Sequence, residues 1–573
     1  MKNKNVADIL RRMGTLLEIK GELVFKIRAY FNAADNIEAL SEDIESLYKE
    51  NRLGEIAGIG KTLEEKIGQY LETGKMKAYE ALTKEIPETL LQITEIPSVG
   101  PKKTKLFFEQ LNIKTIADLK KAAETGKLLD LEGIKQKTID NILRGINIVQ
   151  ENEERMNLGT ATRLADEIMG ALRGFKEVKQ IEVSGSLRRG RETIGDIDIL
   201  VDSSDPSKTM EAFVGLPQVE SVTATGETKS SVRVSGNRQV DLRVVAPDEF
   251  GAALLYFTGS KSFNVKLRQL AMKKKMKVNE YGIFKVKDDK ERRVASKTEE
   301  ECFKALGLPY VAPELREEIG EERVFKGEAI PTLIEEKQIK GELHVHSTYS
   351  DGKNSIEEMA EAAQKRGYAY LAISDHSPRL RIAGGVSEED LKKKKKEIDA
   401  LNKKMKDFRI LFGSEVEVDA QGNLDYNDNI LSEFDFVIAA IHSHFDQDSA
   451  TITQRLLRVI QNKRVHMIAH PMGVHLGKRE ACHIDLKTIC RAAADHNVYL
   501  EINSFPFRLD LNSANAYFAK QQGVKFAINT DAHHIDHLDY MKFGIKVARR
   551  AWLTKDDVLN TKTAEQLLKA LKK

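Results

Sequence analysis

The sequence predicts a multidomain protein of mixed α+β and α/β class, with helical domains first, a sheet-containing domain next and a distorted β/α barrel last. Three observations predict this order. Apolar residues recur at helical i, i+3, i+4 spacing in about the first 150 residues. Strand-like alternation of apolar and polar residues then begins near residue 180. From residue 339 onward, short strands and helices alternate regularly, which is typical of a barrel with its chemistry at the carboxyl ends of the strands.

The composition excludes several classes of protein. A chain of 573 residues is too long for one hydrophobic core, and 41% hydrophobic with 31% charged residues is typical of folded, soluble proteins. The 90 Lys and Arg nearly balance the 88 Asp and Glu, which excludes a uniformly basic nucleic-acid coat. Cys302, Cys482 and Cys490 form no CxxC pair, so we expect neither a disulfide framework nor a thiolate zinc site. No apolar run has the length of a signal peptide or a membrane span, so we expect a cytoplasmic protein that does not enter a membrane.

Histidine divides the chain into two chemically different parts. All 13 histidines lie between His344 and His537, and residues 1–343 contain none. The C-terminal part therefore uses imidazole chemistry, whereas the N-terminal part does not.

The helical part contains an internal repeat. The segment GEIAGIGKTLEEKIGQYL, residues 54–71, is followed by a similar unit at 94–111 and by a weaker third copy at 128–143. In the first two copies an apolar and glycine-containing turn precedes a helix. These units resemble helix-hairpin-helix units, although a single copy could equally be an ordinary helical packing unit.

Glycines in these turns predict contacts with a phosphate backbone. Gly58 and Gly60 in the first unit and Gly100 in the second let the main chain approach a phosphate closely, and the N–H groups of the following helix point at it. Such contacts recognise the DNA backbone without reading its sequence. We therefore expect these three glycines to bind DNA.

An acidic strand follows in the sheet-containing domain. In the sequence TIGDIDIL, Asp196 and Asp198 lie on one face of a strand, and Asp241 on a later strand supplies a third carboxylate. Hard oxygen ligands of this kind suit Mg²⁺ that is also bound by substrate phosphates. An exposed acidic strand would be the simpler interpretation of the two aspartates alone. The preceding GSLRRG turn, residues 185–190, favours a phosphoryl-transfer site with two metal ions, because its hydroxyl, guanidinium and backbone N–H groups can hold a triphosphate.

Four motifs, GSLRRG, GDIDIL, QVDLRVV and LLYFTGSKSFN, resemble those of the family X DNA polymerases, the small repair polymerases related to polymerase beta. The resemblance extends from about residue 1 to residue 315. It implies that the three aspartates are catalytic and hold two Mg²⁺ or Mn²⁺ ions, and that Arg268 lies along the template. It also implies a nucleotide site made by Gly185, Ser186, Arg189, Tyr256, Phe257, Gly259 and Asn264. One departure is Gln239, where the animal enzymes have Arg.

Two further features of this part concern DNA. Residues 261–297 contain thirteen Lys and Arg against four Asp and Glu, and their position after the nucleotide pocket favours phosphate contacts over a solvated helix face. By the same family resemblance, Lys66 aligns with a lysine that forms a Schiff base and removes a 5′-deoxyribose phosphate. The second lysine that the family has in that stretch is replaced by Thr62, so lyase activity and its absence are equally expected.

The histidine-rich part places ligands at nearly every strand end. Imidazoles and carboxylates mixed in this way suit zinc, manganese or iron, and nine of them are enough for two or three ions. The motifs HxH…SDG, SDH, AHP and TDAH resemble the PHP domain, a distorted β/α barrel with a trinuclear site, over residues 339–573. The resemblance implies a ligand set of His344, His346, Asp351, His376, Glu415, His442, His470, Asp531 and His533. The lysine run 392–396 is expected to be a solvated helix face.

The whole chain resembles bacterial and archaeal PolX, in which a family X polymerase is joined to a PHP domain. The predicted limits are a lyase-like helical domain 1–90, a fingers-like domain 91–150, a palm 151–247, a thumb 248–315, a linker 316–338 and a PHP domain 339–573. The resemblance implies a monomeric base-excision repair enzyme that extends a 3′-OH into short gaps of primed or gapped duplex DNA with dNTPs. It also implies a metal-dependent 3′–5′ exonuclease that cleaves at abasic sites as well. Two alternatives remain: a non-polymerising nucleotidyltransferase, and a DNA-binding scaffold whose PHP domain is a small-molecule phosphatase.

Overall fold

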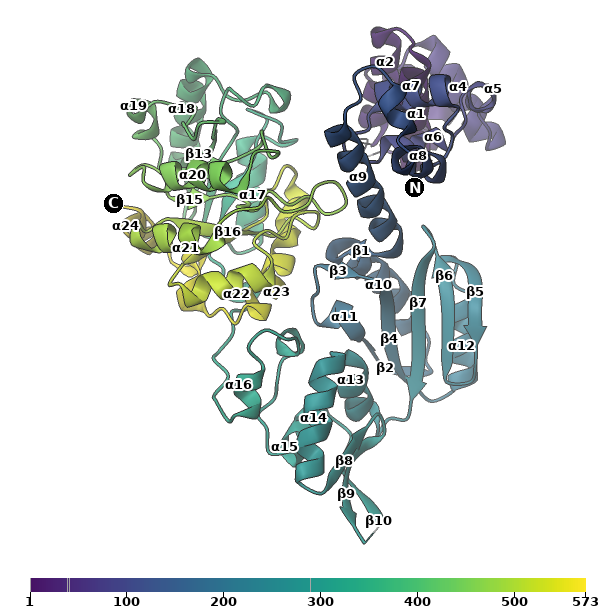
Figure 1. The fold of residues 1–573 in the computed structure, drawn as a ribbon, viewed down its shortest axis with the longest axis vertical. Helices are drawn as coiled ribbons and strands as arrows, with labels where there is room; N and C mark the ends of the chain where they lie inside the picture. The colour runs from purple at the N-terminus through teal and green to yellow at the C-terminus, as the bar shows by residue number, and fades with distance from the viewer. Residues whose placement is uncertain (1, 39, 41, 289, 573) are drawn as a thin grey trace. The chain divides into compact units, whose positions relative to one another are not determined.

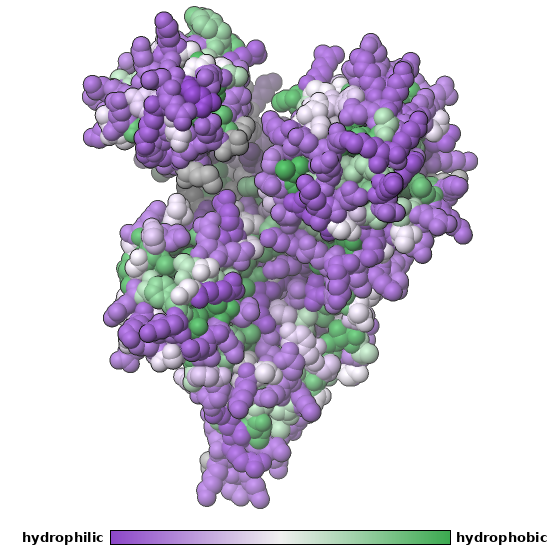
Figure 2. Space-filling view, turned by 180° about the vertical axis from the view of Figure 1, so that it is seen from behind, coloured by the Kyte–Doolittle hydropathy of each residue, from purple (hydrophilic) through white to green (hydrophobic). Residues whose placement is uncertain are grey.

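A computed structural model describes residues 2–38, 40, 42–288 and 290–572, which divide into two compact units, Met1–Asn152 and Glu153–Lys573 (Figure 1). On the face seen in Figure 2, hydrophilic side chains predominate and hydrophobic ones form scattered patches. Within the described part of the chain, no helix combines the length and the apolar character that crossing a bilayer requires.

The first unit is helical throughout its described residues. Its apolar side chains, from Val6 to Val149, form one continuous core, so residues on both sides of the expected limit at residue 90 pack together. The last helix of the series ends two residues beyond the limit of the unit. The helices are α1 (Lys2–Lys20), α2 (Val24–Glu38), α3 (Ile44–Lys49), α4 (Lys61–Thr73), α5 (Lys77–Glu85), α6 (Leu90–Thr94), α7 (Pro101–Leu111), α8 (Ile116–Glu124) and α9 (Gln136–Glu154).

The second unit begins with a five-stranded sheet of order β2-β4-β7-β6-β5. Only β4 and β7 are parallel in this sheet; the other neighbours are antiparallel. Helices α10 and α12 pack against it. Its elements are β1 (Met156–Asn157), α10 (Leu158–Arg173), β2 (Val178–Val183), α11 (Gly185–Arg188), β3 (Thr193–Ile194), β4 (Asp196–Ser203), α12 (Pro206–Val214), β5 (Val219–Thr225), β6 (Lys229–Val234) and β7 (Arg238–Val245).

A smaller region with a three-stranded antiparallel sheet follows. Its elements are α13 (Phe250–Thr258), α14 (Lys261–Lys273), β8 (Met276–Asn279), β9 (Gly282–Lys287), β10 (Lys290–Ala295) and α15 (Glu299–Ala305). The segment 316–338, expected as a linker, contains little regular structure beyond α16 (Glu322–Phe325) and a short 3-10 turn, Glu336–Gln338. It is nevertheless packed, because Arg316 and Glu321 are fully buried and Val324 joins the local core. Two charged residues of this segment are therefore part of its packing.

The rest of the second unit is a seven-stranded parallel sheet in sequence order, β11 to β17. A parallel bridge between Val345 and Ala532 joins the last strand region to the first, so the sheet nearly closes, and the expected distorted β/α barrel is confirmed. The strands are β11 (Gly341–Val345), β12 (Tyr370–Ile373), β13 (Arg409–Glu417), β14 (Phe436–Ala440), β15 (Met467–Ile468), β16 (Tyr499–Asn503) and β17 (Phe526–Asn529).

Helices connect the barrel strands and cover them (Figure 1). Strands covered in this way are buried on both faces, which explains their nearly continuous apolar sequences. The helices are α17 (Ile356–Lys365), α18 (Glu388–Lys404), α19 (Asp428–Leu431), α20 (Ser449–Ile460), α21 (Leu486–Asp495), α22 (Ser513–Gln521), α23 (Met541–Arg550) and α24 (Ala564–Leu571).

One prediction about helix α18 is wrong at a single residue, since Lys392, Lys393 and Lys396 are exposed as expected. The lysine run 392–396 was expected to face solvent, but Lys394 is completely buried. It occupies the same helix face as Leu391 and Ile398, and its ammonium lies 2.9 Å from the equally buried carboxylate of Asp375. A buried charge is tolerated there because it is paired and also donates to the carbonyls of Ile373 and Gly413.

Candidate active sites

Two parallel strands bring the three predicted aspartates of the palm to one place. Asp196 and Asp198 start β4, and the register of β4 and β7 sets Asp198 directly opposite Asp241. The alternate residues Ile197 and Ile199 point into the core and are buried. Alternation along β4 therefore fixes the carboxylates on the other face.

The electrostatics of this cluster favour a bound cation. Burial raises the pKa of Asp198 to about 7, with further increases from the negative charges of Asp196 and Asp241. Lys229 offsets part of this charge, since its ammonium lies 3.0 Å from the carboxylate of Asp241. Gln239 donates a hydrogen bond of 2.9 Å to the other oxygen of Asp241. A metal ion would supply the positive charge that these two side chains only partly provide.

Gly185 makes room for the carboxylate of Asp198. Its φ is +59°, and a Cβ built on it would lie 2.2 Å from an oxygen of Asp198. Any larger residue would therefore displace that carboxylate. The backbone N–H of Ser184 holds the same strand by donating to the carbonyl of Asp198 at 2.7 Å. The role expected for Gly185, a contact with nucleotide phosphates, stays a prediction.

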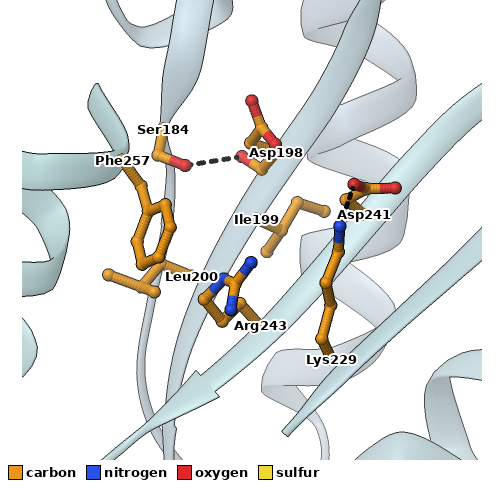
Figure 3. A pocket seen from close by; sticks show the side chains of 8 residues that line it. All are labelled: Ser184, Asp198, Ile199, Leu200, Lys229, Asp241, Arg243 and Phe257. Carbon is orange, nitrogen blue, oxygen red and sulfur yellow. Dashed lines mark hydrogen bonds and ion pairs between the residues drawn. The ribbon is translucent and has the colours of Figure 1, made fainter. Parts of the chain in front are cut away.

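A small pocket opens beside the aspartates (Figure 3). Asp198, Asp241 and Phe257 line it together with Lys229 and Arg243. The guanidinium of Arg243 lies over the ring of Phe257, 4.3 Å from its centroid, which is a cation–π contact. The pocket is small, about 30 Å³, which is room for a water molecule and not for a nucleotide, so the expected place of the sugar against Phe257 stays a prediction.

The two arginines of the GSLRRG turn are both ion-paired. Arg188 makes a bidentate pair with Glu299 of α15 and donates to Thr258. Arg189 is paired with Glu317 at 2.7 Å and donates to the carbonyl of Thr258. The expected contact of Arg189 and Ser186 with incoming phosphates stays a prediction.

The remaining residues of the expected nucleotide site surround the turn after α13. Tyr256 packs edge-on against Phe257, and its carbonyl accepts a hydrogen bond of 2.7 Å from the amide of Asn264. Gly259 has φ +66°, and a Cβ there would lie 3.4 Å from the guanidinium of Arg189. Arg268 is exposed and donates to the carbonyl of Asn264. Asn264 therefore fixes this turn, and the expected contacts of Asn264 and Arg268 with the base pair and the template stay predictions.

In the first unit, two of the three expected DNA-binding glycines immediately precede helices. Gly60 is the N-cap of α4 and Gly100 is the N-cap of α7, and at both positions a Cβ would meet nothing within 4 Å. The N-termini of both helices are thus open to a phosphate. Gly58 has φ +79° in the turn before α4. Lys66 is only half-buried and donates a hydrogen bond of 2.7 Å to the hydroxyl of Tyr30.

All nine ligand residues expected in the barrel converge at the carboxyl ends of its strands. Glu415 of β13 is central: its oxygens lie 2.9 Å from His376, 3.0 Å from His470 and 3.3 Å from His344. Eight of the nine residues fall into three overlapping groups whose ligand atoms lie within 4.8 Å of one another. The groups are His346, Asp351, His376 and His533; His344, His346 and Asp531; and His376, Glu415 and His442. His470 joins the cluster through Glu415.

Buried polar atoms in this cluster fit a set of metal ions. One oxygen of Glu415, Nε2 of His344, Nδ1 of His470 and both ring nitrogens of His346 are buried and make no hydrogen bond of good geometry to the described residues, although several of them lie within 4 Å of another ligand atom. Such orphaned atoms are costly unless something binds them. Burial and the neighbouring His533 and His376 also lower the pKa of His346 to about 3, so its imidazole is neutral and available as a ligand.

Two carboxylates behind the ligands, Glu501 and Glu417, orient the imidazoles of two of them, and sequence reasoning missed both. Glu501 of β16 binds Nδ1 of His344 at 2.8 Å, and its other oxygen accepts from the backbone N–H of His470. Glu417 binds Nδ1 of His442 at 2.7 Å. A hydrogen bond to one ring nitrogen directs the other toward a metal. Strand alternation was the available signal for Glu417, which is two residues from Glu415.

The sequence is similar to several known protein families and to several known proteins. It matches a helix-hairpin-helix domain over residues 1–76, a SAM-like helix-hairpin-helix tandem over 88–147, the DNA polymerase beta thumb over 253–317 and the PHP domain over 342–505. It is 40% identical to the DNA polymerase/3′-5′ exonuclease PolX of Bacillus subtilis (strain 168) over the full length of both chains. It is 25% identical to DNA polymerase lambda of Rattus norvegicus, over 55% of this chain and 56% of that one. A protein of Thermoanaerobacter sp. (strain X514) named "Probable phosphatase" is 30% identical over 38% of this chain and 89% of its own.

Proposed function

The chain belongs to the PolX family, DNA polymerases with 3′–5′ exonuclease activity, and we propose that its two ligand clusters divide these reactions between them. The palm cluster would carry out polymerisation, and the barrel cluster would carry out hydrolysis. The observation that carries this assignment is that two chemically different sets of ligands lie on two different sheets of the second unit. One is made of three aspartates; the other is made mostly of histidines.

In the palm, Asp196, Asp198 and Asp241 would hold two Mg²⁺ or Mn²⁺ ions. Such ions lower the pKa of an attacking hydroxyl and neutralise charge on the transferred phosphoryl group. Asp198 and Asp241 would hold these ions close together, because they lie opposite each other on paired strands. Ser186 and Arg189 bind the phosphates of the dNTP, while Phe257 with Tyr256 supports the sugar and disfavours a ribose 2′-OH.

In the barrel, the nine converging residues would hold two or three ions of manganese, zinc or iron. Such ions provide an activated water and polarise the phosphodiester that it attacks. Glu415 lies between several imidazoles, close enough for one metal ion to bind Glu415 and an imidazole together. Glu417 and Glu501 keep the imidazoles of His442 and His344 in the orientation that binds a metal.

The substrate of both sites would be short gaps in primed duplex DNA, as in base-excision repair. The open N-termini of α4 and α7, preceded by Gly60 and Gly100, support contacts with DNA phosphates in the first unit. Cleavage at abasic sites would be hydrolysis of another phosphodiester of the DNA by the same barrel site. Lys66 is a candidate lyase nucleophile, and borohydride trapping on a 5′-deoxyribose phosphate end tests it: a covalent adduct lost in Lys66→Met supports that role.

The two alternatives are less well supported. Similarity to PolX extends over the complete chain, which a nucleotidyltransferase that does not polymerise would not require. The similarity to a protein named as a phosphatase is confined to 38% of the chain, so it bears on the barrel alone. Hydrolysis of free sugar phosphates without hydrolysis of DNA would revive the phosphatase alternative.

A single assay tests the assignment of the two sites. A 5′-labelled primer on one-nucleotide-gapped DNA is incubated with Mg²⁺ or Mn²⁺, with and without dNTPs. We expect the primer to grow and to shorten with the wild type, to stop growing with Asp196→Ala/Asp198→Ala, and to stop shortening with His344→Ala/His346→Ala. Absence of growth with the wild type, or shortening that survives the histidine changes, would contradict the assignment.

A further inference from the structure

The nucleotide-binding turn of the palm lies directly against helix α23 of the barrel. The guanidinium of Arg550, the last residue of α23, donates a hydrogen bond of 3.1 Å to the carbonyl of Arg189. A Cβ on Gly190 would lie 3.1 Å from the side chain of Lys546, one helical turn earlier. The backbone of the turn that follows Ser186 is therefore in contact with the PHP domain.

Glu317 links these two parts through its carboxylate. One of its oxygens lies 2.7 Å from Nε of Arg189 and 3.3 Å from a terminal nitrogen of Arg550. Its other oxygen lies 3.3 Å from Arg191. The side chains of Arg189, Glu317 and Arg550 are 12, 9 and 3% exposed, so solvent hardly screens these pairs. Burial opposes the charge of Glu317, but the three arginines hold its pKa below the ordinary value.

The contacts of Arg189 fix the plane of its guanidinium. Nε is held by Glu317 and one terminal nitrogen by the carbonyl of Thr258. A guanidinium has five N–H donors in a rigid fork, so two such contacts set its direction and leave further donors for an anion. The guanidinium of Arg189 is therefore already oriented before an anion binds to it.

The barrel in turn holds Arg550 from its other side. Nε of Arg550 donates to the hydroxyl of Ser513 at 3.1 Å, and the same hydroxyl donates to Glu192 at 2.8 Å. Three guanidiniums thus share two carboxylates, those of Glu317 and Glu192. The cluster has an excess positive charge, which favours an anion such as a triphosphate beside it.

We propose that Glu317, held in place by Arg550 of the barrel, is a positioning residue for Arg189 of the polymerase site. The PHP domain thereby preorganises the site for the triphosphate of the incoming nucleotide, besides carrying its own hydrolytic centre. This inference rests on the proposed role of Arg189 in binding that triphosphate. It assigns to the contact between palm and barrel a function in nucleotide affinity.

The test is the KM for a dNTP in extension of one-nucleotide-gapped DNA by the full chain. We expect Glu317→Gln to raise KM about tenfold, because the hydrogen bond to Arg189 loses the negative charge of its acceptor, with a smaller change in kcat. Glu317→Asp should restore part of the affinity. Arg550→Met should raise KM, and the double variant should match Glu317→Gln alone, because Arg550 acts through Glu317.

A matched control comes from the same boundary. Arg549, next to Arg550, pairs with Glu314 at 2.8 Å, and neither of these two residues has a contact with Arg189 among those described. Arg549→Met should therefore leave the KM unchanged. Exonuclease activity and the thermal unfolding temperature of Glu317→Gln report whether the variant is folded.

The outcomes separate this inference from the proposed function. If Arg189→Ala leaves the KM unchanged, the proposed role of Arg189 fails and the inference fails with it. If Arg189→Ala raises the KM but a folded Glu317→Gln leaves it unchanged, only the inference is overturned. A lower KM in Glu317→Gln would also overturn it, since Glu317 would then compete with the nucleotide. Equal effects of Arg549→Met and Arg550→Met on the KM would mean that the contact between palm and barrel is only structural, which would overturn the inference.

Discussion

The ligand clusters of the palm and the barrel differ in how completely the protein builds them. In the palm, three carboxylates lie on two paired strands, and Asp196 at the start of β4 is exposed. In the barrel, six imidazoles and three carboxylates converge, and most of them are buried. Behind them, Glu417 and Glu501 fix imidazole orientations.

This difference indicates how each site would bind its metal ions. Magnesium is usually held by one or two carboxylates together with substrate phosphates, so the palm site is completed when a nucleotide arrives. A closed set of imidazoles and carboxylates binds transition metals without help from substrate. We therefore expect exchangeable ions in the palm and resident ions in the barrel.

The largest predicted effect is that each of two variants loses one of the two reactions and keeps the other. Asp198→Asn should reduce primer extension by roughly a thousandfold or more, because the metal ions contribute several kcal/mol to transition-state stabilisation. Glu415→Gln should reduce primer shortening by a similar factor, because Glu415 contacts several of the imidazoles. Each variant should leave the other reaction near the wild-type rate in a gel assay with labelled primer. Loss of both reactions in either variant would show that the sites are not separate.

A smaller effect on exonuclease activity is expected when a carboxylate that orients a metal ligand is replaced. Glu501→Gln keeps the shape of the side chain but weakens its hydrogen bond to Nδ1 of His344, so exonuclease activity should fall about 10–100-fold. Metal binding should weaken in parallel, measured by titration of the metal-free protein. Glu433→Gln is a suitable control, because that exposed carboxylate of the same barrel pairs only with Lys395 in the described contacts. Full exonuclease activity in Glu501→Gln would mean that His344 needs no orienting partner.

The smallest predicted effect concerns the pH dependence of the palm. The pKa of Asp198 is raised to about 7, and a proton on it competes with the metal, so the Mg²⁺ concentration needed for extension should rise as the pH falls below about 7. Lys229 lowers this pKa. Lys229→Met should therefore move the pH midpoint of extension upward, by about one unit or less.

Lys208 provides the control for this pH profile, since it is an exposed lysine of helix α12 in the same domain and pairs with Asp205. Lys208→Met should leave the pH midpoint of extension where the wild type has it. A midpoint that stays constant or falls in Lys229→Met would contradict the electrostatic account of the aspartate cluster.

Much of the architecture could be predicted because the candidate ligand residues stand at recognisable positions of strands that the sequence pattern predicts. The alternation in GDIDIL sets Asp196 and Asp198 on one face, and the structure sets Asp241 beside them. The regular succession of strands and helices after residue 339 predicts the barrel, and histidines at the strand ends predict one cluster. These are local patterns, which a sequence displays directly.

The rest depends on contacts between distant residues or on exceptions to local rules. Lys394 lies in a run of five lysines, and only its position between Leu391 and Ile398 on one helix face indicated burial. Glu317 and Arg550 are 233 residues apart, so no local pattern pairs them. A charged residue is usually solvated, and a buried partner for it becomes visible only in the folded chain.

The central claim, that resident metals lie in the barrel and exchangeable ones in the palm, is tested most directly by measuring bound metals. The full chain, Asp196→Asn/Asp198→Asn and Glu415→Gln are gel-filtered and analysed by elemental mass spectrometry. We predict that the wild type and the aspartate variant retain the same transition-metal content per chain, and that Glu415→Gln loses much of it. Loss of these metals from the aspartate variant, or their full retention in Glu415→Gln, would contradict the account.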